Sequence, residues 1–345
     1  SFSRKAFLAQ GGNVSKSLLI KLGLLVLAFA LIPALLVGFD KGYYYQIATI
    51  AAIFMLLAAS LHLVTGVAGL LHLGHAALYG VGAYVAAILG ANHGIGFTLG
   101  LPLAGLSAAA IAFLVALPTM RLMSIYFAVA TLGIGQMLYL VFLNWVGLTN
   151  GPNGVMLFSG INLFGLEIDS DLGIYYVVAG VVAISILVLN RLSHSYYGNA
   201  LRSLREDDQC ASAMGINVTV MKIQAFVISA FFAGIAGALW AYTTGYISPN
   251  DFHFSQSILI LTMVVVGGLG SLPGVLIGAL LLILLPEALR SVGDIRNIIV
   301  GVLMFSAILF LPKGLFGEVS ALNFARRVLG QGWAAKKGEK GIGWK

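Results

Sequence analysis

Long apolar runs that carry almost no charged side chain fill most of this sequence. About 20 apolar residues in a row cross the hydrocarbon core of a bilayer as a helix, and backbone polar groups at that depth must find partners inside the protein. With 60% hydrophobic and only 9% charged residues, the sequence predicts an all-α, polytopic transmembrane helical bundle of about 8–10 membrane segments. The runs lie at about 18–37, 45–65, 76–90, 97–118, 122–144, 172–190, 222–243, 256–285 and 297–312.

The loops between these runs differ in charge. The loop at 145–171 carries Glu167, Asp169 and Asp171 but no Lys or Arg, whereas the loop at 191–221 carries several arginines. Cytoplasmic loops of membrane proteins are enriched in Lys and Arg. We therefore expect the first loop on the outer side of the membrane and the second on the cytoplasmic side.

Much of the net charge of +7 falls at the two ends of the chain. This distribution favours cytoplasmic N- and C-termini and gives no support to nucleic-acid binding. The sequence divides into a cytoplasmic N-terminal segment, a transmembrane domain and a basic cytoplasmic tail, at 1–17, 18–317 and 318–345.

A polar stretch from Gly198 to Lys222 interrupts the apolar pattern. Each charge there would cost about 2.5–3.5 kcal/mol at the centre of a membrane helix, so the stretch must lie in water or against a soluble partner. Gly215 is a helix stop of the C-cap kind. Either a solvated loop or a short helix offered to a cytoplasmic protein fits this pattern. Four apolar residues would share one face of such a helix: Leu201, Leu204, Ala211 and Met214.

Two apolar segments are interrupted by glycines. Such breaks are typical of a transport path near the bilayer midplane, although the same glycines would also allow close helix packing. The late break splits the run at 256–285, for which we expect two short helices that return to the outer side, with 297–312 crossing inward. The candidate path residues are Gly66, Gly69, His72, Gly74 and His75 in the early break and Gly267, Gly268 and Gly270 in the late one.

A packing role is clearer in the run at 222–243. Small side chains recur there at helical spacing in two adjacent rows, which predicts close contact with another helix. The rows consist of Ser229, Ala233, Gly237 and Ala241, and of Ala230, Gly234 and Ala238.

Groups that would power transport from within the membrane are scarce. Lys21 is the clear charged residue inside the predicted spans, whereas proton-driven transporters need buried titrating groups. The energy is therefore expected to come from outside the membrane domain, with sodium coupling through backbone carbonyls left open. The sequence has no ATP-binding motif of its own, and His62, His72 and His75 lack the further ligand that a metal site would need. We expect no cofactor, no metal and no enzymatic activity.

Several stretches together resemble one family. The sequence is similar, from about residue 45 to 317, to the LivM-type permeases of branched-chain amino-acid ABC importers (the LivHM permease family). The stretches that carry the resemblance are Gly198–Asn217, Gly69–Ala77, Thr149–Gly154, Ala225–Ala238, Val264–Ser271 and Leu311–Gly317.

The resemblance implies a bacterial inner-membrane permease subunit that translocates branched-chain or related hydrophobic amino acids. Its partners would be a second homologous permease, two cytoplasmic ATP-binding subunits and a periplasmic substrate-binding protein. The alternatives are a sodium-coupled secondary transporter, or a permease of the same family for urea, amides or aromatic acids. The ATPase-coupling residues would be Leu201, Arg202, Leu204, Arg205, Asp207, Ala211, Met214, Gly215 and Ile216. The receptor-docking residues would be Asn150, Gly151, Pro152, Asn153 and Gly154.

Overall fold

The computed structural model describes residues 41–120, 122, 124–157, 160–163, 166–168, 170–290, 299, 301–302 and 305. The predicted segment at 1–17, the predicted span at 18–37 and the predicted tail at 318–345 lie outside the described residues, as does most of the predicted span at 297–312.

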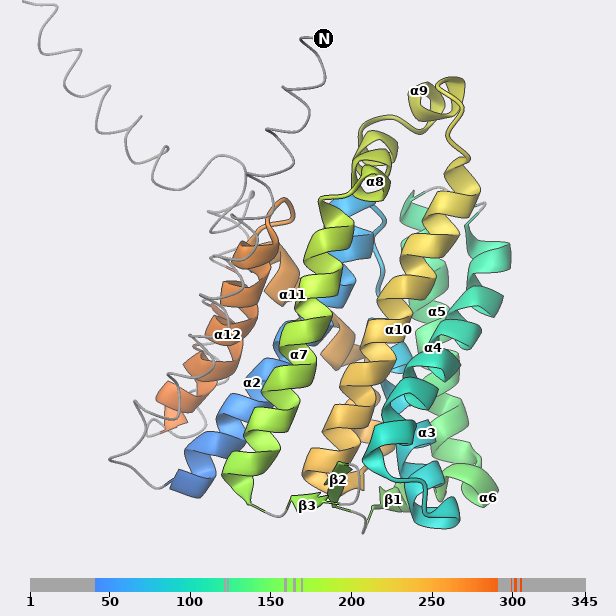
Figure 1. Cartoon of the computed structure of the whole chain (residues 1–345). Helices are drawn as coiled ribbons and strands as arrows, with labels where there is room; N and C mark the ends of the chain where they lie inside the picture. Colours follow the sequence, from blue (N-terminus) through green and yellow to red (C-terminus); the bar gives the residue numbers. More distant parts are fainter. Residues whose placement is uncertain are drawn as a thin grey trace, which may run out of the picture.

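Apolar helices form a bundle, as the sequence predicts (Figure 1). Within the described residues, five helices are long and apolar enough to cross a membrane. The first, α2, has 22 residues and is therefore about 33 Å long, which matches a hydrocarbon core of about 30 Å. The principal helices are α2 (Lys41–His62), α3 (His75–His93), α4 (Phe97–Thr119), α5 (Ser124–Asn144), α7 (Asp171–Ser193) and α10 (Val218–Thr244).

The run at 256–285 forms two short helices, which confirms the prediction of a broken segment. These are α11 (Phe254–Gly267) and α12 (Leu272–Ala288), which pack against each other. Gly268 makes the break with a φ of +113°, a conformation that side-chain-bearing residues rarely adopt. The hydroxyl of Tyr43, at the start of α2, donates a hydrogen bond to Glu287 near the end of α12. The pair α11–α12 therefore returns to the end of the bundle where α2 begins.

Short elements mark the two ends of the bundle (Figure 1). At one end, which we call the ribbon end, two antiparallel pairs of short strands form, β1 with β4 and β2 with β3. At the other, the α8–α9 end, the chain between α7 and α10 forms two short helices. The elements are η1 (Leu63–Val67), α6 (Val146–Thr149), η2 (Gly151–Asn153), β1 (Val155–Met156), β2 (Ile161–Leu163), β3 (Leu166–Ile168), α8 (Tyr196–Glu206), α9 (Asp208–Ala213), β4 (Tyr246–Ile247) and η3 (Pro249–Phe252).

Helix α10 packs closely against α3 and α4, as the small-residue rows predict. A Cβ atom on Gly82 would lie 2.3 Å from the carbonyl oxygen of Gly234, and one on Gly234 would lie 2.5 Å from that of Ala104. Glycine is required on both sides of this crossing because the backbones themselves are in contact. Every member of the two rows is buried: Ser229, Ala230, Ala233, Gly234, Gly237, Ala238 and Ala241.

Helix α5, unlike α10, is largely exposed, and it is the least buried of the five long spans. Only 22% of its most apolar window is buried, compared with 67% for α10. Large apolar side chains such as Ile125, Val129 and Met137 are more than half exposed. A surface of this kind fits lipid or another membrane subunit, because apolar exposure carries no penalty in hydrocarbon.

Candidate coupling loop and transport segments

Helix α8 is held on the bundle by its own apolar residues. Ser195 caps its N-terminus by accepting a hydrogen bond from the backbone N–H of Gly198, as Ser commonly does at this position. Leu201 and Leu204 are fully buried, and the helix contacts α7, η1 and α10. The amphipathic spacing in the sequence therefore reflects packing within this chain.

A second helix, α9, begins at Asp208, directly after its N-cap Asp207, where the apolar spacing predicts that one helix continues. Asp207 has an extended backbone (φ −158°, ψ 114°), and its carboxylate accepts hydrogen bonds from the N–H groups of Gln209 (2.7 Å) and Cys210 (2.9 Å). These bonds, first that from Cys210 and then that from Gln209, hold the pKa of the Asp207 carboxyl below its usual value. The single helix predicted through this point is wrong because Asp caps a new helix more readily than it continues an old one.

Helix α9 ends in a Schellman motif, and Gly215 is the predicted stop. Its φ of +84° is the left-handed conformation that this motif requires. The N–H of Gly215 donates to the carbonyl of Ser212 (2.9 Å), and that of Ile216 donates to the carbonyl of Ala211 (3.2 Å). Gly215 and Ile216 thus fix the direction in which the chain turns back toward α10.

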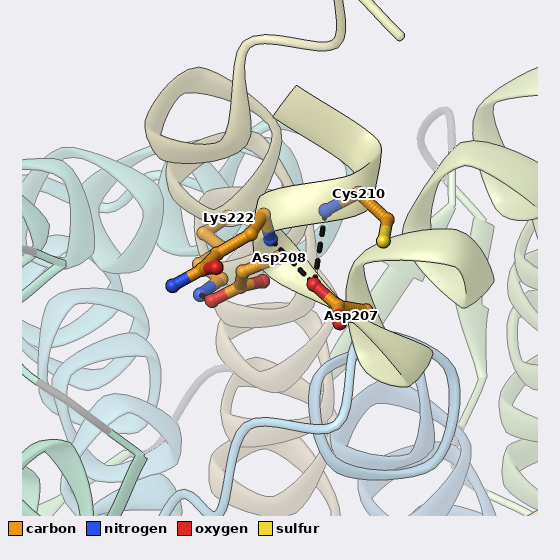
Figure 2. A network of polar contacts seen from close by, with 5 residues as sticks. Asp207, Asp208, Cys210 and Lys222 are labelled. Carbon is orange, nitrogen blue, oxygen red and sulfur yellow. Dashed lines mark hydrogen bonds and ion pairs between the residues drawn. The ribbon is translucent and has the colours of Figure 1, made fainter. Parts of the chain in front are cut away.

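Charged and polar side chains connect α9 to the start of α10. Lys222 forms an ion pair with Asp208 in the first turn of α9 (Figure 2). Asn217 caps α10 by accepting a hydrogen bond from the N–H of Val220 (3.2 Å). The α8–α9 loop is therefore a defined structure whose two helices are each capped and each attached to the bundle.

The four apolar residues predicted to share one exposed face are divided by the structure. Leu201, Leu204 and Ala211 are at most 4% exposed and face this chain's own helices, whereas Met214 is 83% exposed. Three of the four therefore seat the loop on the bundle, and Met214 is the one available to another protein. The exposed surface around it includes Arg202, Arg205, Glu206, Asp207, Asp208, Gln209 and Cys210.

The early glycine break contains one π-helical turn, η1, at the end of α2. The N–H of Ala68 donates to the carbonyl of Leu63 (3.2 Å), and that of Leu70 donates to the carbonyl of Val64 (3.0 Å). π-Turns inside helices occur often at functional sites. Beyond it, Gly69 has a φ of +74°, and the chain is not helical again until α3.

The structure brings the two glycine breaks together. A Cβ atom on Gly66 would lie 2.6 Å from the carbonyl oxygen of Leu269, in the turn between α11 and α12. Arg205 of α8 reaches the same place, where its Nη1 donates a hydrogen bond to the carbonyl oxygen of Gly66 (2.6 Å). No pattern in the sequence indicates this contact, because the partners are 139 residues apart.

The structure shows where along the bundle the two breaks meet, and their predicted place near the bilayer midplane stays a prediction. The π-turn follows the full length of α2, about 33 Å from its start, and contacts α8. Both breaks therefore meet near the α8–α9 end rather than at the middle of the bundle. The apolar pattern of a sequence gives the order of segments but not the level at which a long helix ends.

The glycines of both breaks are tightly packed. Added Cβ atoms would lie 2.3 Å from the carbonyl oxygen of Thr131 at Gly74, and 2.4 Å from that of Gly274 at Gly267, whereas Gly270 is exposed. The void that borders His72 and Gly74 measures about 10 Å³, roughly the room needed for one water. The packing interpretation fits these glycines in this arrangement, and a passage for an amino acid requires the helices to move apart.

A buried polar layer lies beside the early break. The Nε2 atom of His75 is hydrogen-bonded to the hydroxyl of Ser60 (2.9 Å), and the hydroxyl of Ser229 donates to the Ser60 carbonyl (2.7 Å). Both ring nitrogens of His72 are buried without a hydrogen-bond partner among the described residues, and so is Nδ1 of His62. Within that part of the chain, no group of three or more His, Cys, Asp or Glu is placed to hold a metal ion.

The predicted receptor-docking run forms a compact turn at the ribbon end. Asn150 has a φ of +59°, and its side-chain amide donates to the carbonyl of Gly154 (2.9 Å). Gly151 and Gly154 also have positive φ. The turn borders a hollow of about 570 Å³, lined in part by Asn150 and Asn153. The apolar side chains exposed beside it were not predicted as part of this surface: Trp145, Val146 and Leu148.

Comparison with known proteins gives the family. The model of the family described as branched-chain amino acid transport system / permease component matches residues 43–310. The chain belongs to this family. The matched range contains both glycine breaks, the α8–α9 loop and the turn at Asn150, so all of these features lie in the part that family members share.

Individual relatives agree with this assignment. The chain is 36% identical over 327 residues to the high-affinity branched-chain amino acid transport system permease protein LivM of Escherichia coli strain K12, covering 88% of this chain and 76% of the relative. It is 28% identical over 297 residues to the permease protein LivH of the same organism, covering 78% and 93%. A similar protein, BraD of Pseudomonas aeruginosa, is 31% identical over 168 residues, 47% of this chain and 54% of the relative. No solved structure matches the chain.

Proposed function

We propose that this chain is the permease subunit of an ATP-driven ABC importer for branched-chain or related hydrophobic amino acids. The observation that carries the proposal is the similarity to LivM over 88% of the chain, because that protein is named for branched-chain amino acid transport. The bundle itself supports a transport role without its own energy source. Three of the five spans in the described part of the chain contain no Asp, Glu, Lys or Arg: Gly42–Val67, Phe97–Thr119 and Ile125–Asn144.

The α8–α9 loop is the surface proposed to receive the ATP-binding subunits. Its caps at Ser195, Asp207 and Asn217 give it a fixed shape at one end of the bundle (Figure 1). A fixed shape favours binding of a partner because less conformational freedom is lost when the complex forms. Under this proposal the α8–α9 end lies in the cytoplasm of a bacterial cell, the ribbon end lies outside, and the termini lie on the cytoplasmic side of the inner membrane.

A second, homologous permease is the proposed partner inside the membrane. The chain is similar to both LivM and LivH, two permease proteins of one organism. Helix α5 offers the surface for pairing, because most of its length is exposed and apolar. The glycine breaks, the polar layer and α5 would then border the substrate path, with Gly74 in contact with Thr131 of α5.

The turn at Asn150 is proposed to meet the periplasmic substrate-binding protein. It lies at the end opposite the α8–α9 loop (Figure 1) and combines a fixed backbone, amide side chains around a hollow and exposed apolar groups at Trp145 and Val146. Protein interfaces favour such aromatic and aliphatic anchors with a polar rim.

Transport by the reconstituted complex tests the proposal. The chain is co-expressed with the proposed partner permease and ATP-binding subunits from the same organism, and the complex is placed in liposomes with the receptor. Uptake of radiolabelled leucine, isoleucine or valine is expected when ATP is supplied on the side of the membrane opposite the receptor, and not with a sodium gradient alone. Uptake driven by sodium without ATP would refute the proposal in favour of a secondary transporter. Uptake of urea, amides or aromatic acids in place of these amino acids would refute the substrate class.

A further inference from the structure

Arg205 occupies a junction that no local sequence pattern predicts. It lies in the last turn of α8, and its guanidinium donates to the carbonyl oxygen of Gly66 in the π-turn η1 (2.6 Å). A hydrogen bond from a charged donor is stronger than a neutral one. The sequence predicts that Arg205 contacts an ATP-binding subunit, but its guanidinium is also bonded to this chain's own π-turn.

The stem of Arg205 also covers the backbone of the early break. A Cβ atom on Gly69 would lie 2.7 Å from the Cγ of Arg205 and 3.4 Å from its Cα. Gly69 has a φ of +74°, so its backbone turns toward α8 where a larger residue would be strained. Arg205 therefore contacts the break at two points, with its charged end at Gly66 and its aliphatic stem at Gly69.

The late break reaches the same junction. The carbonyl oxygen of Leu269 lies where a side chain on Gly66 would be, at 2.6 Å from the added Cβ. Gly66 is thus in contact with Arg205 of α8 through its carbonyl oxygen and faces both the His62 ring and the turn that joins α11 to α12. Three segments from distant parts of the sequence meet at one peptide group.

We propose that Arg205 is a latch that ties α8 to both glycine breaks. Arg205 is a positioning residue. A displacement of α8 moves Gly66 through the hydrogen bond from Arg205, and Gly66 moves the α11–α12 turn through its contact with Leu269. Both breaks therefore move with the loop. Leu201 and Leu204 seat α8 by burial without a directional bond, so α8 stays on the bundle when the latch is removed. The inference rests on the proposed function, because it gives the α8–α9 loop a route to the substrate path.

Accessibility of the π-turn tests the latch directly. Ala68 is 3% exposed and lies between Gly66 and Gly69, so Ala68→Cys, in a Cys210→Ser background, reports opening of the turn through its rate of reaction with a maleimide. In the assembled, nucleotide-free complex, Arg205→Met keeps the stem and removes the donors. We expect it to raise this rate by about tenfold or more, the size expected for losing one charge-assisted hydrogen bond. Arg202→Met is the matched control, because Arg202 lies on the same helix and bonds only to Asn199 among the described residues.

Transport coupling gives the second measurement. With Arg205→Met, the substrate transported per ATP hydrolysed is expected to fall about tenfold below the ratio measured for Arg202→Met, which loses a charge from the same exposed surface of α8 but no contact with Gly66. Arg205→Gln keeps one donor group on a shorter stem. Its labelling rate and its transport ratio are expected to lie between those of the wild type and of Arg205→Met, and this variant replaces Arg205→Met if the latter does not fold. An unchanged labelling rate, or an unchanged transport ratio, overturns the latch. Absence of ATP-dependent uptake in the wild-type complex would instead overturn the proposed function, whatever the labelling shows.

Discussion

Replacing Gly234 by Ala is expected to force α10 away from α4. The added Cβ would lie 2.5 Å from the carbonyl oxygen of Ala104 and 2.7 Å from the Cβ of Ala108. Favourable contacts between carbon atoms begin at about 3.5 Å, so the two helices must separate by about 1 Å. The atoms met are backbone and a methyl group, and neither can rotate aside.

The size of the effect follows from the weaker van der Waals attraction across the widened crossing. A gap of about 0.5–1 Å removes a quarter to a half of the roughly 0.1–0.2 kcal/mol that each atom pair contributes. Over several tens of pairs along the interface of α10 with α4, the destabilisation is about 1–3 kcal/mol, the range typical of overpacked cores. The same change at Gly180 of α7 is the control, because a Cβ there meets nothing within 4 Å. Ala at that position is expected to be neutral or to stabilise α7 by up to about 1 kcal/mol.

Thermal unfolding of the detergent-purified protein, followed by size-exclusion chromatography after heating, measures both variants. Gly234→Ala should lower the apparent melting temperature by several degrees, at about 2–4 °C per kcal/mol for domains of a few hundred residues, and Gly180→Ala should not lower it. Equal melting temperatures for the two variants would refute the idea that backbone contact at the crossing requires glycine.

Three further predictions concern the α8–α9 loop. Met214→Glu should weaken co-purification of the ATP-binding subunits about tenfold without changing the melting temperature, whereas Tyr196→Glu, equally exposed at the start of α8, should leave co-purification unchanged. Asp207→Ala should speed backbone amide exchange at the start of α9, and Asp207→Asn should not, because Asn also caps helices. The folded-state pKa of Asp207 is lowered from its usual value of 3.8. The stabilisation of α9 by the Asp207 carboxylate is therefore fully present above pH 3.8 and is lost only as the pH falls through the lower folded-state pKa. The amide exchange rate at the start of α9, corrected for the intrinsic rate, should be constant from about pH 5 to 8. Gly215→Ala should destabilise the loop by about 1–2 kcal/mol through its left-handed backbone, measured by the same exchange experiment, and an unchanged rate would exclude that strain.

Much of the fold was predictable because length and hydrophobicity identify membrane helices directly. The expected span at 97–118 is α4 (Phe97–Thr119), and the broken run at 256–285 is α11 and α12. The strand pairs of two or three residues at the ribbon end escaped prediction, since so short a stretch has no recognisable period. The division of α8 from α9 was also missed, because the apolar spacing continues across Asp207.

The candidate site was harder to predict for a different reason. Helical spacing predicted that Leu201, Leu204 and Ala211 share a face, but apolar residues fit the same chain as well as a partner. The structure places the three residues in two helices and buries all of them within the chain. The contact of Arg205 with Gly66 joins two loops that no local pattern relates. Sequence patterns selected the candidate residues, whose roles stay predictions, and only the folded chain shows how these residues pack.

The attachment of α9 to α10 has a mechanical consequence. The ion pair of Lys222 with Asp208 ties α9 to a helix that is itself packed between α3 and α4 by backbone contact at Gly234. A displacement of α9 relative to the bundle therefore requires either that this ion pair breaks or that α10 moves with it. The α8 end of the loop is held separately, by the burial of Leu201 and Leu204 and by the hydrogen bond from Arg205 to Gly66, so the two ends of the loop are attached to different parts of the bundle.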